Sequence, residues 1–201
     1  MGRVNVVVVS AACALLLAGC TSAPAGSPGP TASPTTSETA APAPTPTDEG
    51  ADDLSDPELG IVFEDVPELD GDAADVHNWI ATYSTEYWRT MTTNEVSPAF
   101  DLIGSADVQA TMQGIVDQNV SSQVDIAGVF HARVGDVVVE GDTARGTVCD
   151  DYRDVTFTDP NGTYTPDDVG FGEPRHKTLT LTRVPDEDRW LVLTSVVEGT
   201  C

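Results

Sequence analysis

Five side chains between residues 83 and 152 have the types that donate or exchange protons inside a pocket. They are Tyr83, Tyr87, His131, Asp150 and Tyr152. A tyrosine hydroxyl can donate a hydrogen bond to a ligand, and so can a carboxylic acid kept neutral by apolar surroundings. Tyr83 and Tyr87 are four residues apart, which is about one turn of a helix. Asp150 and Tyr152 are two residues apart in a strand pattern, so they face the same side.

These residues predict that the Tyr87 hydroxyl lies close to one of the three polar strand residues. We expect such a contact because a buried tyrosine hydroxyl normally has a hydrogen-bond partner. A second interpretation needs no chemistry. Aromatic residues on a helix face are more often core than catalytic, and adjacent acids such as Asp150 and Asp151 more often form a solvated rim.

Metal and cofactor motifs are not evident in the sequence. The run from Asp159 begins like a calcium loop, but its glycine, Gly162, is two positions early, and Gly170 stands where a bidentate glutamate is needed. The three histidines are scattered without ligand spacing. There is no phosphate loop, nucleophile elbow or zinc motif. We expect a turn after Asp159, and neither a metal nor a cofactor.

The charge of the chain excludes one class of partner. Its 201 residues include 33 acidic and 9 basic side chains, for a formal net charge of −24. So acidic a protein is repelled by the phosphates of nucleic acids and by anionic lipid headgroups. We therefore expect no nucleic-acid partner.

The first 20 residues have the pattern of an export signal. Arg3 precedes an apolar stretch at residues 6–17, which is shorter than the roughly 20 residues that span a bilayer. The stretch leads into the sequence LAGC at residues 17–20. This ending resembles the lipobox of bacterial lipoproteins, which implies cleavage before Cys20 and a lipid on its thiol. Residues 1–19 are then a lipoprotein signal peptide, and the mature protein is lipid-anchored, extracytoplasmic, on the outer face of the cell membrane.

The chain has four cysteines. Cys13 leaves with the signal peptide and Cys20 carries the lipid, so Cys149 and Cys201 remain. An even pair of cysteines in an exported protein suggests a disulfide, and we expect a structural bond between these two. A redox role is disfavoured because the pair has no C-x-x-C spacing.

Residues 20–71 have the composition of a disordered tether. Residues 21–50 contain seven Pro, eleven Ser or Thr and no large apolar side chain, so they cannot bury enough surface to offset the entropy of ordering. The acidic run after Asp48 suits a solvated spacer, and it would also suit a tail that binds cations or a partner. Residues 61–69 are apolar enough to lie against the domain as an extended arm.

The remaining residues, 72–201, are enough for one globular domain. Apolar residues at spacings of three and four predict a long helix that begins after the N-cap Asp72 and ends near Asn94. A short helix is expected from Ser97 to Gly104, and a third helix is expected after the N-cap Ser105.

After residue 122 the apolar period changes to two, which predicts strands. The expected strands are residues 123–134, 137–140, 143–158, 176–184 and 189–197. Gly128 is an expected bulge, and Gly135-Asp136 an expected turn between the first two strands. Helices followed by strands predict an α+β fold, with the helices packed on the sheet.

Three helices before a curved antiparallel meander resemble the nuclear transport factor 2-like superfamily, which includes SnoaL-like polyketide cyclases and ketosteroid isomerases. The aromatic-rich first helix also matches, as does a mid-sheet cysteine with a second cysteine at the C-terminal end. The resemblance implies a cone-shaped fold with a pocket between the long helix and the inside of the sheet. With the lipobox and the Ala/Thr/Pro bias, the chain looks like an actinobacterial-type lipoprotein.

The sequence leaves three functions open. The first is a non-enzymatic, lipid-anchored domain that binds a small apolar ligand or a cell-envelope protein, and this is the function we expect. The second is an isomerase, dehydratase or cyclase, which a deep pocket with buried polar residues would favour. The five candidate side chains, however, do not match a known catalytic pattern one by one. The third is an interaction module whose acidic surface recruits cations or a basic partner.

Overall fold

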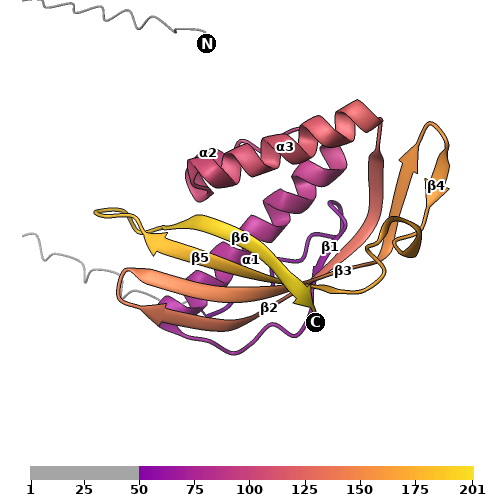
Figure 1. Ribbon diagram of the computed structural model, residues 1–201. Helices are drawn as coiled ribbons and strands as arrows, with labels where there is room; N and C mark the ends of the chain where they lie inside the picture. Colours follow the sequence, from indigo (N-terminus) through magenta and orange to yellow (C-terminus); the bar gives the residue numbers. More distant parts are fainter. Residues whose placement is uncertain (1–49) are drawn as a thin grey trace, which may run out of the picture. The chain divides into compact units, whose positions relative to one another are not determined.

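The structure is a computed structural model that describes residues 50–201. In this range the chain forms an α+β fold, in which one open six-stranded sheet carries three α-helices on one side (Figure 1). The predicted signal peptide, the lipidation site Cys20 and most of the predicted tether lie outside the described residues. Within residues 50–201, the longest helices are too polar or too short to cross a bilayer.

The helices come where the sequence predicts them. They are α1 (Gly71–Thr93), α2 (Phe100–Ile103) and α3 (Ala106–Ser122). The N-cap of α1 is Asp70, two residues before the predicted Asp72, and its C-cap is Asn94 in a left-handed conformation. The predicted cap Ser105 is confirmed, since its side chain accepts a hydrogen bond from the backbone N–H of Val108.

The strands form a mixed sheet. They are β1 (Ile61–Phe63), β2 (Asp125–Glu140), β3 (Thr143–Asp159), β4 (Gly162–Tyr164), β5 (Arg175–Arg183) and β6 (Trp190–Thr200). Their order is β1-β2-β3-β5-β6, with β4 paired to β3. The pairs are antiparallel except that β1 runs parallel to β2. The expectation of an all-antiparallel sheet is therefore wrong at one edge, where a strand from before the helices joins it.

The predicted turn at Gly135 and Asp136 is also wrong. β2 continues through these residues as one strand, and its pairing with β3 shifts register between Gly135 and Val138. Asp136 has a φ of 47°, a backbone conformation that occurs in bulges as well as in tight turns. The Gly135-Asp136 pair therefore indicates a break in regular strand geometry, but it does not distinguish a bulge from a turn that reverses the chain.

The domain begins before the predicted boundary at residue 72. β1 pairs with the middle of β2, and Ile61 is fully buried. The turn before β1 is closed by Asp56, whose carboxylate accepts hydrogen bonds from the backbone N–H groups of Glu58 and Leu59. The segment expected to lie on the domain as an arm therefore starts as a strand of the sheet, and residues 51–59 pack ahead of it.

Two glycines allow the chain at the start of β1 to lie very close to β2. Gly60 and Gly128 both have positive φ, at 78° and 113°. A Cβ at Gly60 would lie 2.4 Å from the carbonyl oxygen of Gly128, and a Cβ at Gly128 would lie 2.2 Å from that of Asp154. The backbones at Gly60, Gly128 and Asp154 thus approach one another too closely for a side chain at either glycine.

An aromatic cluster joins the arm, α1 and the sheet. The indole of Trp88 stacks on Phe130 with ring centroids 5.2 Å apart, and its N–H donates to the Leu59 carbonyl at 3.0 Å. Phe130 in turn packs against Tyr152 at 5.0 Å. These rings fill the space between α1 and the sheet, so the core lies on the side of the sheet that the helices cover.

Cys149 and Cys201 form the expected disulfide, with Cα atoms 6.0 Å apart. Cys149 lies in β3 and Cys201 directly follows β6, with β5 between the two strands. The bond therefore attaches the end of an edge strand to the middle of the sheet.

Removing this bond should destabilise the domain. For a bridge between residues 52 apart, the loss of a chain constraint predicts a decrease of about 4 kcal/mol in the free energy of unfolding. We expect Cys201→Ser to lower the melting temperature by roughly 10 °C, measured by circular dichroism. The matched control is Cys149→Ser/Cys201→Ser, whose melting temperature should not respond to reductant. A wild-type melting temperature unaffected by full reduction would contradict the prediction.

Candidate functional site

A pocket of about 500 Å³ lies between α1, α3 and the ends of β5 and β6. Its apolar walls come from Met91, Met112, Ile115, Phe171 and Val197. Its polar groups come from Tyr83, Tyr87, Thr111, Gln118, Asn119, Arg175, Lys177 and Ser195. The pocket is therefore apolar along its sides and polar at its floor and rim.

The period of each element brings these residues together. Tyr83, Tyr87 and Met91 are spaced by four residues on α1, so they share one face of the helix. Ile115 and Asn119 have the same spacing on α3. On β5 and β6, alternate side chains point to the same side of the sheet, which turns Lys177 of β5 toward the helices.

The floor of the pocket holds an ion pair that is almost fully buried. The Lys177 ammonium lies 2.5 Å from the Asp150 carboxylate, and the two residues are 7% and 1% exposed. The same ammonium lies 4.2 Å from the centre of the Tyr87 ring, in a cation–π contact. Lys177 is the only lysine of the chain. One oxygen of Asp150, Oδ1, is buried with no partner among the described residues.

Burial and charge together set the protonation of this floor. Burial alone would lower the pKa of the Lys177 ammonium, but the Asp150 carboxylate and the neighbouring Tyr87 and Tyr83 raise it above its ordinary value. Burial also raises the pKa of the Tyr83 hydroxyl, and raises that of Tyr152 well above its ordinary value. Lys177, Tyr83 and Tyr152 therefore all keep their protons at neutral pH.

The expected contact of Tyr87 with a polar strand residue is confirmed. The hydroxyls of Tyr87 and Tyr152 lie 2.9 Å apart in the core, and one donates to the other. Tyr83 lines the pocket beside Ser195 of β6. Asp150 and Tyr152 face the same side, as their spacing predicted, but Asp150 contacts Lys177 and belongs to no solvated rim.

His131 is not part of this pocket, which corrects the predicted cluster with Tyr87 and Asp150. On β2 the side chains of Phe130 and Ala132 point into the core, so His131 points to the other face of the sheet. Its cross-strand neighbour is Asp151, whereas Asp150 is opposite Ala132. The sequence pattern predicts that His131 lies on a strand, but it does not show which face of the sheet the side chain occupies.

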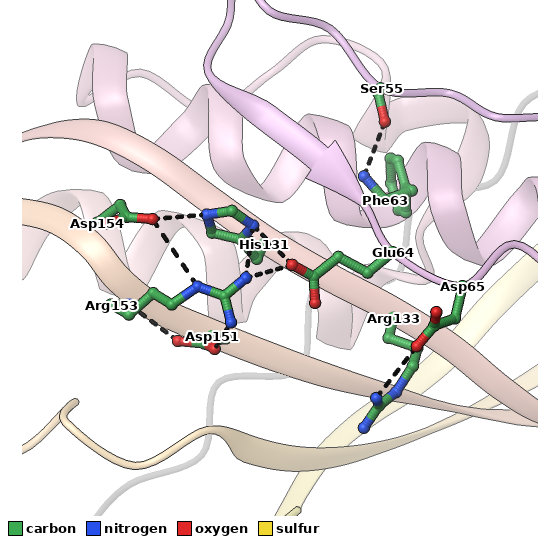
Figure 2. A network of polar contacts seen from close by, with 9 residues as sticks. All are labelled: Ser55, Phe63, Glu64, Asp65, His131, Arg133, Asp151, Arg153 and Asp154. Carbon is green, nitrogen blue, oxygen red and sulfur yellow. Dashed lines mark hydrogen bonds and ion pairs between the residues drawn. The ribbon is translucent and has the colours of Figure 1, made fainter.

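On that outer face His131 belongs to a network of charged side chains (Figure 2). Its ring nitrogens lie 3.0 Å from Glu64 and 2.9 Å from Asp154. Arg153 contacts both of these acids and bonds Asp151 at 2.8 Å. Because Glu64 directly follows β1, the network attaches the N-terminal arm to β2 and β3.

Lys177 and Arg175 are not among the five side chains that the sequence predicts for the site. A usable signal was present: in the alternating run HKTLTLTRV, Lys177 has the same parity as Leu179 and Leu181, both of which are buried. A lone lysine on the apolar side of a strand needs a buried partner of opposite charge, and Asp150 is that partner.

No model of a known protein family matches the chain, and no curated protein matches it. Within residues 50–201, no group of three or more His, Cys, Asp or Glu side chains is placed to hold a metal ion. The function of the pocket has to be argued from its geometry.

The ion pair predicts a characteristic pattern of stability. Lys177→Met leaves Asp150 buried without its partner and should lower the free energy of unfolding by about 3–5 kcal/mol, measured by urea denaturation. Lys177→Met/Asp150→Leu removes both charges and should recover most of that loss. The control is Arg133→Met, which breaks the exposed pair with Asp65 and should cost at most about 1 kcal/mol.

The deficit of Lys177→Met should also depend on pH. Burial raises the pKa of the Asp150 carboxyl, and in this variant its main opposing charge is gone. The unfolded chain then ionises at lower pH than the folded one, so the variant loses stability as pH rises above about 4. The difference from wild type should therefore shrink between about pH 7 and pH 4. A single variant as stable as the double variant at neutral pH would contradict the role of the pair.

Proposed function

We propose that the protein is a lipid-anchored, extracytoplasmic binding protein whose domain takes a small, largely apolar ligand into the pocket between α1, α3 and the sheet. One observation carries the proposal: the pocket of about 500 Å³ has apolar walls around a floor that holds the Lys177–Asp150 ion pair and, behind it, the Tyr87–Tyr152 hydrogen bond. This composition is typical of sites that bind small molecules, where a few polar groups orient an otherwise apolar ligand.

A small ligand is favoured over an envelope protein by where the apolar surface lies. Met91, Met112 and Phe171 present their side chains inside a concavity. A protein partner would need a broad exposed patch, whereas a pocket of this volume suits a molecule of a few tens of atoms or fewer.

Catalysis of the isomerase or cyclase type is less well supported, although the floor holds buried polar side chains. Such chemistry needs a group that accepts a proton near neutral pH. The buried ammonium of Lys177 and the hydroxyls of Tyr83 and Tyr152 retain their protons. Asp150 is committed to Lys177, and His131 lies on the other face of the sheet.

The family proposal rests on the arrangement of elements. Helices precede the sheet, α1 lies across its inner side, and β2 and β3 bend along their length (Figure 1). These features support a cone-shaped, nuclear transport factor 2-like domain. The lipoprotein proposal rests on the residues around Cys20, which resemble a lipobox.

Ligand uptake can be tested with the neutral apolar fluorophore N-phenyl-1-naphthylamine and the chain from residue 20 to 201 carrying Cys20→Ser. Wild-type pocket residues should give a saturable rise in fluorescence. Ile115→Trp places a large ring in the pocket from a half-buried wall position, and it should weaken binding at least about tenfold, because the ring occupies the apolar volume.

The matched control is Val138→Trp, at an exposed position of β2 beside a different hollow. It adds the same aromatic ring outside the pocket and should leave probe binding unchanged. Binding by Ile115→Trp as tight as by the wild type would show that the pocket is not the site.

Attachment is tested separately in a bacterial host. Cys20→Ala removes the thiol that would carry the lipid, so labelling with radioactive palmitate should disappear, and the protein should leave the membrane fraction. Continued fractionation with membranes would mean that the lipobox interpretation is wrong.

A further inference from the structure

We infer that the ligand of this pocket is an amphiphile with one negative charge, a carboxylate, whose headgroup binds Lys177 and Arg175 while its apolar tail lies between α1 and α3. The inference rests on the proposed function, because it names the class of ligand that the same pocket takes.

The charge at the floor is the first argument. None of the residues that line the pocket is acidic, although the chain as a whole has a net charge of −24. Lys177 and Arg175 contribute two positive charges, and the Asp150 carboxylate, which is paired with Lys177, contributes one negative charge. One positive charge therefore remains uncompensated in a largely apolar site, and a monoanion would neutralise it.

Unused hydrogen-bond donors are the second argument. The Lys177 ammonium has three N–H donors, and among the described residues Asp150 is its only ion-pair partner. Arg175 is two residues away on the same face of β5. Its guanidinium lies 3.7 Å from the centre of the Phe171 ring and donates to the Gly170 carbonyl at 2.8 Å. This stacking holds the planar group in place and leaves further N–H groups for a carboxylate.

The rim supplies a further donor. Asn119 on α3 lines the pocket, and its Nδ2 is buried with no hydrogen-bond partner among the described residues. An unpaired buried N–H is unfavourable unless a ligand or water accepts from it. Lys177, Arg175 and Asn119 thus approach the pocket from two sides, each with donors to offer.

The same geometry disfavours other headgroups. The position over the Tyr87 ring and beside Asp150 is one where a ligand cation would bind, and Lys177 already occupies it. A dianionic phosphate would leave an uncompensated negative charge next to the buried Asp150. A neutral headgroup would leave the positive charge without a partner.

The walls explain why the rest of the ligand is an apolar tail. Met91 of α1 and Met112 and Ile115 of α3 all line the pocket. Methionine side chains adapt to different apolar shapes, which suits a flexible alkyl chain better than a rigid polar ring.

The single lysine makes the inference directly measurable. We would label the chain from 20 to 201, carrying Cys20→Ser, with lysine enriched in ¹⁵N at Nζ, so that one ammonium signal reports on the pocket floor. Dodecanoate, dodecanol and dodecyltrimethylammonium would be added below their micellar concentrations. Dodecanoate should bind at least about tenfold more tightly than dodecanol and shift the Lys177 signal, whereas the cation should not compete with it.

Variants then assign the headgroup contact. Arg175→Gln should weaken dodecanoate binding at least about fivefold and weaken dodecanol binding far less, because only the acid uses the charge. Arg145→Gln, an exposed position on β3 outside the pocket, is the control that should change neither. Arg175 is used because Lys177 variants disturb the buried ion pair.

The outcomes separate this inference from the proposed function. Equal affinities for dodecanoate and dodecanol, or an Arg175→Gln variant that binds dodecanoate like the wild type, would overturn the carboxylate inference while apolar binding stands. If all three amphiphiles and the naphthylamine probe fail to bind, the proposed function is wrong and this inference fails with it.

Discussion

The buried pair of Lys177 and Asp150 constrains the rest of the domain. Either charge alone would be strongly unfavourable in the core, so β3 and β5 must keep the register that holds them together. The pair also keeps the pocket open. Apolar side chains that collapsed onto the Lys177 ammonium would remove its remaining donors from water without replacing those hydrogen bonds. A polar floor under apolar walls is therefore a stable arrangement for a cavity that a ligand can fill.

Most of the fold could be predicted from local patterns. The helix spacing, the N-cap Ser105 and the alternating strands are local signals, and the structure agrees with them. β1 was not predicted as a strand, because it is three residues long and its partner in β2 is about 69 positions away in the sequence. The sequence at Asp136 predicts a turn where the strand instead has a bulge, because both use the same backbone conformation.

Only part of the candidate site can be predicted from the sequence, and the physical reason is that strand parity fixes relative faces but not which face is buried. Strand parity correctly placed Asp150 and Tyr152 on one face, where Tyr87 meets Tyr152. The same parity argument, applied to His131 beside Phe130, would have placed the histidine outside. The burial of Lys177 does not follow from its own strand, because a charged residue normally faces solvent and only pairing with a carboxylate elsewhere in the chain makes its burial favourable.

The disulfide has a consequence for how copies of the protein behave beside one another. β6 is the last strand in the sheet order, and Val196 and Val197 on it are half exposed. The end of an edge strand is prone to detach and pair with the sheet of a second molecule. Because Cys201 is bonded to Cys149, the end of β6 cannot leave its own sheet. The covalent bond therefore opposes strand exchange between neighbouring molecules.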